Sequence, residues 1–304
     1  MRHLARLLGL SLLVSLCASA HAASIAVVLS EPSPVYQEYA NALRTELRRD
    51  NPNIDVQLID GEQLAARPLP DAQFVIGVGN RAAQIIMGRD VKAPILLALL
   101  PKSAYDRIAA GRRDDKHITG LFIDQPPQRY IDLVRTALPD AERVGMLAGP
   151  DSRDTVTRLA QAARERKLRP VQESVASEAD IFPALQRMFG DGGVLLAVPD
   201  MTIFNSQTIP NILLSTYRFR VPVIGFSQAY VRAGALVALY STPAQIGQQS
   251  ADIARAVMSG GALPAPQYPR LFTVGVNTHV ARSLGLQIES EGVVREKLEK
   301  LERP

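Results

Sequence analysis

Residues 118–147 read ITGLFIDQPPQRYIDLVRTALPDAERVGML, and the order of patterns in this stretch decides the fold class. An apolar run at 118–123 predicts a buried strand, and a second apolar run at 143–147 predicts another. Between them, the prolines at 126–127 predict the start of a helix and Pro139 predicts its end, because proline fits the first turn of a helix and disrupts its interior. Strand, helix and strand in this order form the unit of a parallel sheet that helices cover.

The same alternation of apolar runs and helical patterns extends toward both ends of the chain. Continuous apolar runs indicate strands that are buried on both faces, as in parallel sheets between layers of helices. We therefore expect an α/β protein with two Rossmann-like lobes, each built on a parallel sheet. The further expected strands are 24–30, 54–59, 74–78, 94–100, 194–198, 221–224 and 236–240.

The length of 304 residues allows two domains, and the two series of strands meet near residue 120. The segment after Ser241 is expected to cross back between the lobes as a long helix. Because ligands bind beyond the carboxyl ends of the strands in open parallel sheets, we expect the site in strand-end loops that face one another across a cleft. The expected divisions are a signal peptide at 1–22, an N-terminal lobe at 23–117 with part of 242–265, a C-terminal lobe at 118–241 with part of 266–288, and a charged C-terminal tail at 289–304.

The N-terminus has the pattern of a secretory leader. Arg2 and Arg6 form a charged region, residues 7–16 form a short apolar core, and an A-x-A site follows at 20–22. The apolar core is too short to cross a bilayer. We expect cleavage after Ala22 and a mature protein in the bacterial periplasm.

Lipidation at Cys17 is the alternative, but the bulky Leu16 precedes it where a small residue is wanted. Cleavage removes the only cysteine, so neither disulfides nor thiol chemistry are expected in the mature chain. The formal net charge of +4 falls to +2 when Arg2 and Arg6 leave with the signal peptide. Nucleic-acid binding needs clustered positive charge, which this nearly balanced chain lacks, so we expect no nucleic-acid partner.

Two loop segments match the sequence pattern of an enzyme motif. Residues 77–82, GVGNRA, fit the G-x-G-x-x-G/A dinucleotide fingerprint after a predicted strand, but no acidic residue follows at the required distance. The alternative reading is a tight glycine turn that leaves amides near Asn80 and Arg81 free at a helix N-terminus, where a carboxylate can bind. We therefore expect no dinucleotide cofactor.

The second match is the segment Gly225-Phe226-Ser227-Gln228-Ala229, which resembles the turn that presents a hydrolase nucleophile. That design needs an acid and then a histidine downstream, and His279 is the only downstream candidate. His279 falls on a predicted surface helix at 278–284, where a solvated residue is the simpler interpretation. No His/Cys/Asp/Glu cluster has metal-ligand spacing, so neither a metal nor a catalytic centre is expected.

Five stretches in order resemble the family of ABC-transporter substrate-binding proteins related to bacterial tryptophan- and phenylalanine-binding proteins. Departures fall at expected cleft positions: Asn80 stands where the family often has Thr, residues 151–154 read DSRD where an Asn-Ser pair is usual, and the loop at 30–39 differs. The fold therefore carries over more safely than the ligand. The matching stretches are VIGVGNRAAQIIM at 75–87, residues 118–150, VPDMTIFN at 198–205, residues 222–264 and VNTHVARSLGL at 276–286.

The resemblance implies a type I periplasmic binding fold, in which two lobes close around a small solute and the closed form docks on an ABC permease in the inner membrane. It implies a monomer without catalytic activity or cofactor. The expected ligand-binding residues lie in the strand-end loops and are Ser30, Tyr36, Gly79, Asn80, Arg81, Asp151, Ser152, Asp200, Thr202, Phe226, Ser227 and Gln228. Each of them has the alternative interpretation of a loop cap or turn former.

The expected solute is an amino acid or a related carboxylate. Free amides near Asn80, helped by Arg81 if it turns inward, can receive the carboxylate. Asp200, or alternatively Asp151, can receive an ammonium group. The apolar walls would come from Tyr36 and Phe226.

Two other functions stay open at this point. A sensory or scaffold protein of the same fold would need only a cleft and a docking face, which residues alone do not distinguish from transport. The third reading is a serine hydrolase that uses Ser227.

Overall fold

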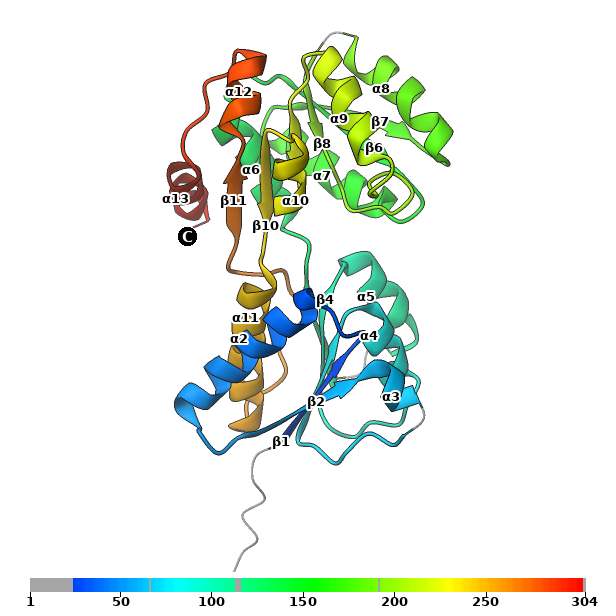
Figure 1. Ribbon diagram of the computed structural model, residues 1–304, viewed down its shortest axis with the longest axis vertical. Helices are drawn as coiled ribbons and strands as arrows, with labels where there is room; N and C mark the ends of the chain where they lie inside the picture. Colours follow the sequence, from blue (N-terminus) through cyan, green and yellow to red (C-terminus); the bar gives the residue numbers. More distant parts are fainter. Residues whose placement is uncertain (1–23, 66, 113–115, 191, 303–304) are drawn as a thin grey trace, which may run out of the picture.

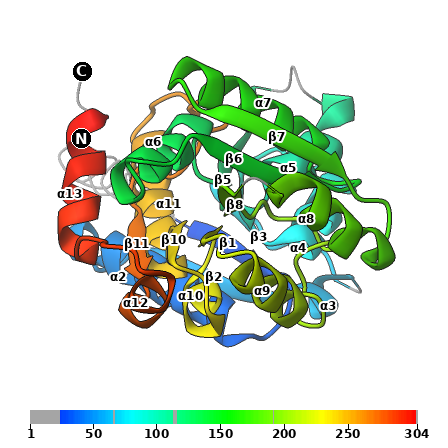
Figure 2. The same cartoon turned by 90° about the horizontal axis from the view of Figure 1, so that it is seen from above.

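The computed structural model describes residues 24–65, 67–112, 116–190 and 192–302, and the predicted signal peptide lies outside them. The described chain forms two α/β lobes, one above the other in Figure 1. Each lobe has its own sheet with helices on both faces (Figure 2). The expected fold class, two lobes with largely parallel sheets, is confirmed.

The first lobe contains a 5-stranded parallel sheet in the order β2-β1-β3-β4-β5. Its strands are β1 (Ser24–Leu29), β2 (Asp55–Asp60), β3 (Phe74–Val78), β4 (Ile95–Leu100) and β5 (Ile118–Phe122). Its helices are α2 (Pro34–Asp50), α3 (Gly61–Ala65), α4 (Asn80–Met87), α5 (Lys102–Ile108) and the 3-10 turn η1 (Ala110–Arg112). The expected lobe boundary between residues 117 and 118 is wrong, because β5 pairs with β4. An apolar run predicts a strand but does not say which sheet the strand joins.

The second lobe contains a 6-stranded sheet in the order β11-β10-β9-β8-β6-β7. Its strands are β6 (Arg143–Ala148), β7 (Arg169–Ser174), β8 (Val194–Leu196), β9 (Val223–Gly225), β10 (Val237–Tyr240) and β11 (Thr273–Val276). Its helices are α6 (Pro127–Ala137), α7 (Arg153–Glu165), η2 (Glu178–Asp180), α8 (Ile181–Phe189), α9 (Ile209–Arg218), α10 (Gln228–Ala233) and α12 (Thr278–Leu284). The sequence patterns missed both edge strands, β7 and β11. The outer strand β7 is partly exposed and polar, and β11 runs antiparallel to β10.

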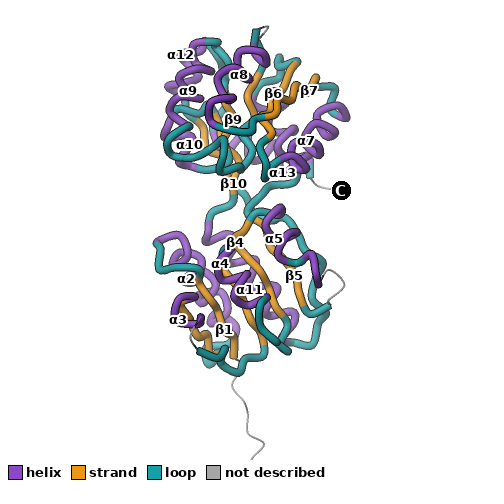
Figure 3. The backbone as a smooth tube through the Cα atoms, turned by 90° about the vertical axis from the view of Figure 1, so that its right-hand side faces the viewer, coloured by secondary structure: helices purple, strands orange, loops and turns teal. Residues whose placement is uncertain are grey.

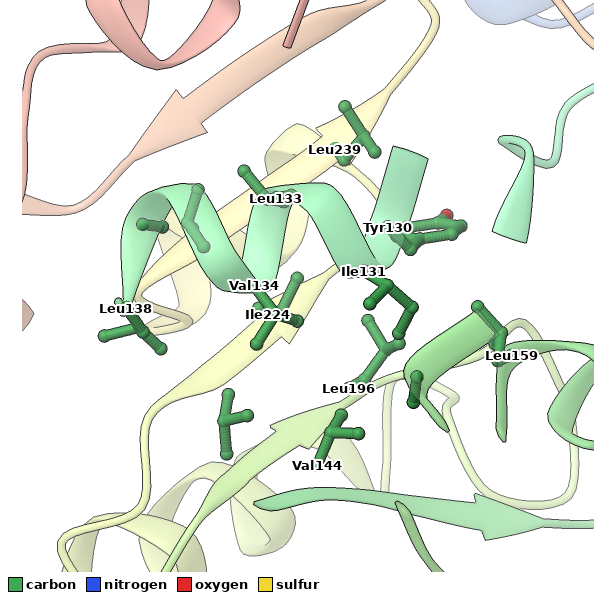
Figure 4. Packing of buried hydrophobic residues seen from close by; sticks show 14 of the residues in the cluster. Tyr130, Ile131, Leu133, Val134, Leu138, Val144, Leu159, Leu196, Ile224 and Leu239 are labelled. Carbon is green, nitrogen blue, oxygen red and sulfur yellow. The ribbon is translucent and has the colours of Figure 1, made fainter. Parts of the chain in front are cut away.

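The apolar face of α6 packs on the second sheet, as the opening stretch of sequence predicted. Ile131 and Val134 are fully buried, one turn apart on the helix. They meet apolar side chains that rise from successive strands of the sheet (Figure 4). These strand residues include Val144, Leu196, Ile224 and Leu239. Removal of this apolar surface from water fixes the helix on the sheet.

Helix α11 (Pro243–Met258) returns the chain to the first lobe and packs along α2 (Figure 1). A capping box begins it, since Thr242 accepts a hydrogen bond from the Gln245 N–H and the Gln245 side chain accepts one from the Thr242 N–H. The two helices approach closely at Gly247, where a Cβ atom would lie 2.5 Å from the backbone oxygen of Tyr39. A side chain at this position would push the helices apart.

The expected charged tail at 289–304 is wrong for most of its length. Residues 291–301 form α13 (Glu291–Leu301), which packs against α6 and β11. Val294 and Leu298 stand four residues apart on one face of the helix and are buried. This spacing gives an otherwise charged helix a narrow apolar stripe, which is enough to hold it against the second lobe.

Three segments of the described chain cross between the lobes, and together we call them the hinge: residues 123–126, 241–242 and 259–272 (Figure 3). Gln125 donates from Nε2 to Ser241 Oγ at 2.9 Å, and Ser241 Oγ donates to the Leu271 carbonyl at 2.5 Å. Arg129, which is 5% exposed, donates to Gln125 Oε1 and to the Pro269 carbonyl. These bonds join all the crossing segments to one another.

Candidate functional site

The carboxyl ends of the parallel strands in both sheets lie at the junction between the lobes, whereas the antiparallel β11 begins there (Figure 1). In the first lobe, the predicted residues at this junction follow β1 and β3. In the second lobe, they follow β6, β8 and β9. The structure therefore gathers the expected residues in two opposing groups, and their individual contacts decide what each can do.

Ser30 and Gly79 form the base of the first group. The Ser30 hydroxyl donates to the Val78 carbonyl at 2.8 Å and accepts from the Ala82 N–H at 3.0 Å. Gly79 has a φ of +84°, and a Cβ there would lie 2.5 Å from the Tyr36 hydroxyl. Burial raises the pKa of Tyr36, while its hydrogen bond with Ser30 lowers it in part. These contacts fix the turn that starts α4, with Tyr36 lying directly over it.

Asn80 and Arg81 are exposed in the first turn of α4. Arg81 forms an ion pair at 2.9 Å with Glu62 of α3 in the same lobe. The condition under which Arg81 would help to bind a carboxylate, an inward turn toward the second lobe, is therefore not met here. Asn80 instead lines an open groove of about 450 Å³ between α4 and α5. The other residues of this groove are Gln84, Met87, Ala104, Arg107 and Ile108.

Asp200 is the centre of the second group and is 5% exposed. Its Oδ2 accepts hydrogen bonds from Ser152 Oγ at 2.9 Å and from the Asp151 N–H at 3.1 Å. Its Oδ1 accepts from the Thr202 N–H at 2.9 Å. A Cβ at Gly149 would lie 2.4 Å from Oδ2, so the loop after β6 wraps tightly around the carboxylate. Asp200 thus already ties two loops of its own lobe together.

The carboxylate of Asp151 takes part in an ion pair between the lobes. Its Oδ1 lies 3.2 Å from Arg107 NH1 on α5. The two side chains are 48% and 59% exposed, which leaves the pair largely in water. Such exposed pairs contribute about 0–1 kcal/mol. The pair is a weak contact across the junction, and it involves the carboxylate that was expected, as the alternative to Asp200, to receive an ammonium group.

Phe226, Ser227 and Gln228 are all half-buried at the end of β9. The Phe226 ring lies 4.5 Å from that of Tyr230 and 6.2 Å from that of Phe204, measured between centroids. Gln228 Oε1 accepts a hydrogen bond from the Tyr240 hydroxyl. Ser227 occupies the N-cap position of α10, although its side chain makes no capping hydrogen bond.

His279 is the histidine that the sequence offered as a partner for Ser227, and it contacts another residue of its own helix. His279 is exposed on α12, and its Nδ1 lies 3.2 Å from Arg282 NH2. In the described part of the chain, no group of at least three His, Cys, Asp or Glu side chains could hold a metal ion. None of the helices in the described residues has the length and apolar character to cross a bilayer.

A narrow pocket at the hinge contains charged residues that the sequence interpretation did not select. We define this hinge pocket by Lys102, Asp124, Thr155, Arg158 and Tyr268, which line it together with Gln125, Tyr130 and apolar side chains. Two of them were accessible to the strand-end rule, since Lys102 follows β4 and Asp124 follows β5. Arg158 in the second turn of α7 and Tyr268 in the hinge carried no comparable signal.

Comparisons with known proteins identify one family and a fold that many solved structures share. The family model described as ABC transporter substrate binding protein matches residues 51–298. The ABC domain from Streptococcus pneumoniae in complex with L-Trp is similar, with 19% identity, 90% of this chain and 98% of that chain covered, and a TM-score of 0.62. No curated protein matches the chain.

Two further solved structures illustrate the range of this fold. The ligand-free, open form of a substrate-binding protein with adhesive properties from Clostridium difficile has 15% identity, with 88% and 96% of the two chains covered and a TM-score of 0.71. A solute-binding protein from Agrobacterium vitis bound with α-D-tagatopyranose has 11% identity, with 88% and 99% covered and a TM-score of 0.53. At these identities the likeness establishes the fold, and the bound molecules belong to those proteins.

Proposed function

The chain belongs to the family of ABC transporter substrate-binding proteins, and from this premise we propose that it captures a small solute between its lobes and delivers it to an ABC permease in the inner membrane. Its family consists of binding proteins rather than enzymes, which removes the hydrolase reading of Ser227. The observation that supports the proposal best is the meeting of both sets of strand ends at one junction, joined by the hinge. Ligands of open parallel sheets bind at such ends.

The proposed solute is an amino acid or a related carboxylate. The fold itself accepts more than one class, since similar proteins hold L-Trp and α-D-tagatopyranose. Charged side chains in the hinge pocket favour a charged solute over a neutral sugar here. The strand-end residues named from the sequence are proposed to surround the solute, with Ser30, Gly79, Ser152 and Asp200 acting mainly through the loops that they hold in shape.

The proposed place of action is the periplasm, where the mature chain would work as a monomer after cleavage behind Ala22. The leader pattern of residues 1–22 supports export. Mass spectrometry of the protein purified from an expressing bacterium would identify the mature N-terminus. A chain that keeps residues 1–22, or carries lipid on Cys17, would contradict this part of the proposal.

A thermal-shift screen of residues 23–304 against amino acids, small carboxylates, nucleosides and sugars tests solute binding. A solute present at a hundred times its Kd stabilises the folded chain by about 2.7 kcal/mol, which is visible as a raised unfolding midpoint. Failure of every class to raise the midpoint would contradict the proposal.

Delivery is tested separately by uptake of the identified, radiolabelled solute into cells with and without the gene. We expect uptake to fall without the gene and to return with the wild-type protein. Unchanged uptake together with solute binding would favour a sensing role.

A further inference from the structure

The hinge pocket brings together charged side chains from both lobes. Lys102 begins α5 in the first lobe, Asp124 lies in the hinge, and Arg158 and Thr155 belong to α7 in the second lobe. Tyr268 closes the pocket from another segment of the hinge. A molecule bound here would contact every part that moves when the lobes close.

Arg158 has few hydrogen bonds for a guanidinium group in such a place. Among the described residues, its one hydrogen bond runs from NH2 to Thr155 Oγ1 at a long 3.4 Å. Its Nε is buried and has no hydrogen-bond partner in the described chain. A guanidinium carries five N–H donors and matches a carboxylate in a two-bond arrangement. Arg158 is therefore available to receive a carboxylate.

Asp124 presents the opposite charge in the same pocket and is 8% exposed. Its Oδ2 accepts the backbone N–H of Lys102 at 2.6 Å. The ammonium of Lys102 is directed elsewhere, 2.6 Å from Asp106 and 5.7 Å from the centre of the Phe122 ring. The charges of Arg158 and Lys102 compensate the buried Asp124 carboxylate only in part, since neither forms an ion pair with it among the described residues, so a positively charged ligand group would be favoured beside it.

We propose that the hinge pocket binds the charged head of an α-amino acid, with Arg158 receiving the carboxylate and Asp124 receiving the ammonium group. This inference rests on the proposed function and names the residues that would select its solute. It differs from the expectation drawn from the sequence, in which amides near Asn80, helped by Arg81, receive the carboxylate and Asp200 or Asp151 receives the ammonium. The charged groups of Arg81 and Asp200 contact partners within their own lobes.

The pocket is narrow in this conformation. Its volume of about 10 Å³ leaves room for roughly one water molecule. An amino-acid head therefore binds only in a conformation whose lobes stand farther apart than here, with Arg158 and Asp124 on either side of it. Arg158 and Asp124 stand on parts that move relative to each other. A solute with both charges therefore stabilises the closed form more than a solute with one charge.

Calorimetric titration of the mature protein tests the inference with the variants Arg158→Gln and Asp124→Asn. The probes are the twenty L-amino acids and D-ribose, followed, for each amino acid that binds, by its decarboxylated amine and its deaminated acid. Arg164→Gln is the control, because Arg164 is exposed on the same helix. Unfolding midpoints of all variants establish that they fold, and Arg158→Lys supplies a second variant that keeps the charge.

We expect Arg158→Gln to weaken an amino acid by about 30-fold or more, and Arg158→Lys to weaken it less. The same change should leave the decarboxylated amine unaffected. Asp124→Asn should weaken the amino acid by a similar factor and leave the deaminated acid unaffected, while Arg164→Gln changes nothing. A merely structural role for either residue would weaken all these probes alike and would overturn the inference.

Other outcomes separate the inference from the proposed function. An amino acid that binds both variants as tightly as the wild type leaves solute binding intact and refutes the hinge pocket as its site. Binding of D-ribose but of no amino acid refutes the inference and leaves a sugar-binding protein. Failure of every probe to bind the wild type would refute the amino-acid form of the proposed function and the inference with it.

Discussion

At the scale of single residues, burial changes the role that a strand-end position suggests. Asp200 follows β8 and was expected to face the solute, yet all its hydrogen bonds come from its own lobe. Asp151 lies in the loop after β6 and pairs with Arg107. A buried carboxylate needs donors, and neighbouring loops supply them before any ligand does.

Asp200→Ala should lower the free energy of unfolding of the solute-free protein by about 2–4 kcal/mol, because it leaves the Ser152 hydroxyl and two backbone N–H groups without their acceptor. Urea unfolding of the mature protein measures this. Asp140→Ala serves as the control, since Asp140 is exposed between α6 and β6. Unchanged stability together with lost solute binding would instead indicate that Asp200 contacts the solute directly.

Asp124 should make stability depend on pH. Burial raises its pKa, while two backbone N–H groups and the charges of Arg158 and Lys102 lower it in part. Since the folded-state pKa lies above the unfolded value, ionisation opposes folding, and stability is lost as the pH rises through the folded pKa.

The variant Asp124→Asn removes this titration. We expect its stability relative to the wild type to be greatest near neutral pH and to shrink as the pH falls toward about 4, where the wild-type carboxyl becomes protonated in both states. Unfolding midpoints across this range, measured without solute, test the expectation. A difference between the two proteins that does not change with pH would contradict it.

At the scale of elements, a narrow apolar stripe is enough to make a charged helix pack against the rest of the protein. Helix α13 is charged along most of its surface, and it is held by Val294 and Leu298. It also brings Glu302 to the guanidinium of Arg129, whose NH2 donates to Glu302 Oε2 at 2.8 Å. The C-terminal helix thus supports a residue that connects the hinge segments.

Leu298→Ala should lower the free energy of unfolding by about 2–5 kcal/mol, the usual cost of a cavity at a fully packed site. Leu298 is 1% exposed, whereas Leu301 on the same helix is 56% exposed. Leu301→Ala is therefore the control, and we expect it to change stability by less than about 0.5 kcal/mol. Equal effects of the two changes would show that α13 does not depend on this stripe.

At the scale of the whole molecule, the hinge joins the two lobes, and an ion pair outside it also connects them. The ion pair between Arg107 and Asp151 spans the junction away from the hinge segments. Because both side chains are largely in water, the pair can bias the distance between the lobes only weakly. We therefore expect this ion pair to affect the equilibrium between open and closed forms rather than the free energy of unfolding.

Arg107→Gln should shift this equilibrium toward the open form by at most about 1 kcal/mol. Fluorescence energy transfer between dyes on the two lobes measures the shift, which should diminish at high salt. Asp151→Asn should give the same change, and the double variant should add nothing further. Additive effects would indicate that the two residues act independently.

The sequence by itself determined the α/β class, the parallel direction of most strands and the helices between them. These features depend on local patterns such as those of residues 118–147, where the apolar runs and the prolines predict a strand, a helix and a second strand. It did not place β5 in the first sheet, because the same apolar run satisfies either sheet. It also missed β7 and β11, whose edge positions leave only weak patterns.

Only the tertiary structure decided how the candidate site is composed. The position of strand ends placed Asp200 and Asp151 at the junction between the lobes, but their charged groups contact residues of distant loops and of the other lobe. The hinge pocket joins Lys102, Asp124, Arg158 and Tyr268 over more than 150 residues of chain. Hydrogen bonds and charges between such distant residues depend on packing in three dimensions, which no local pattern records.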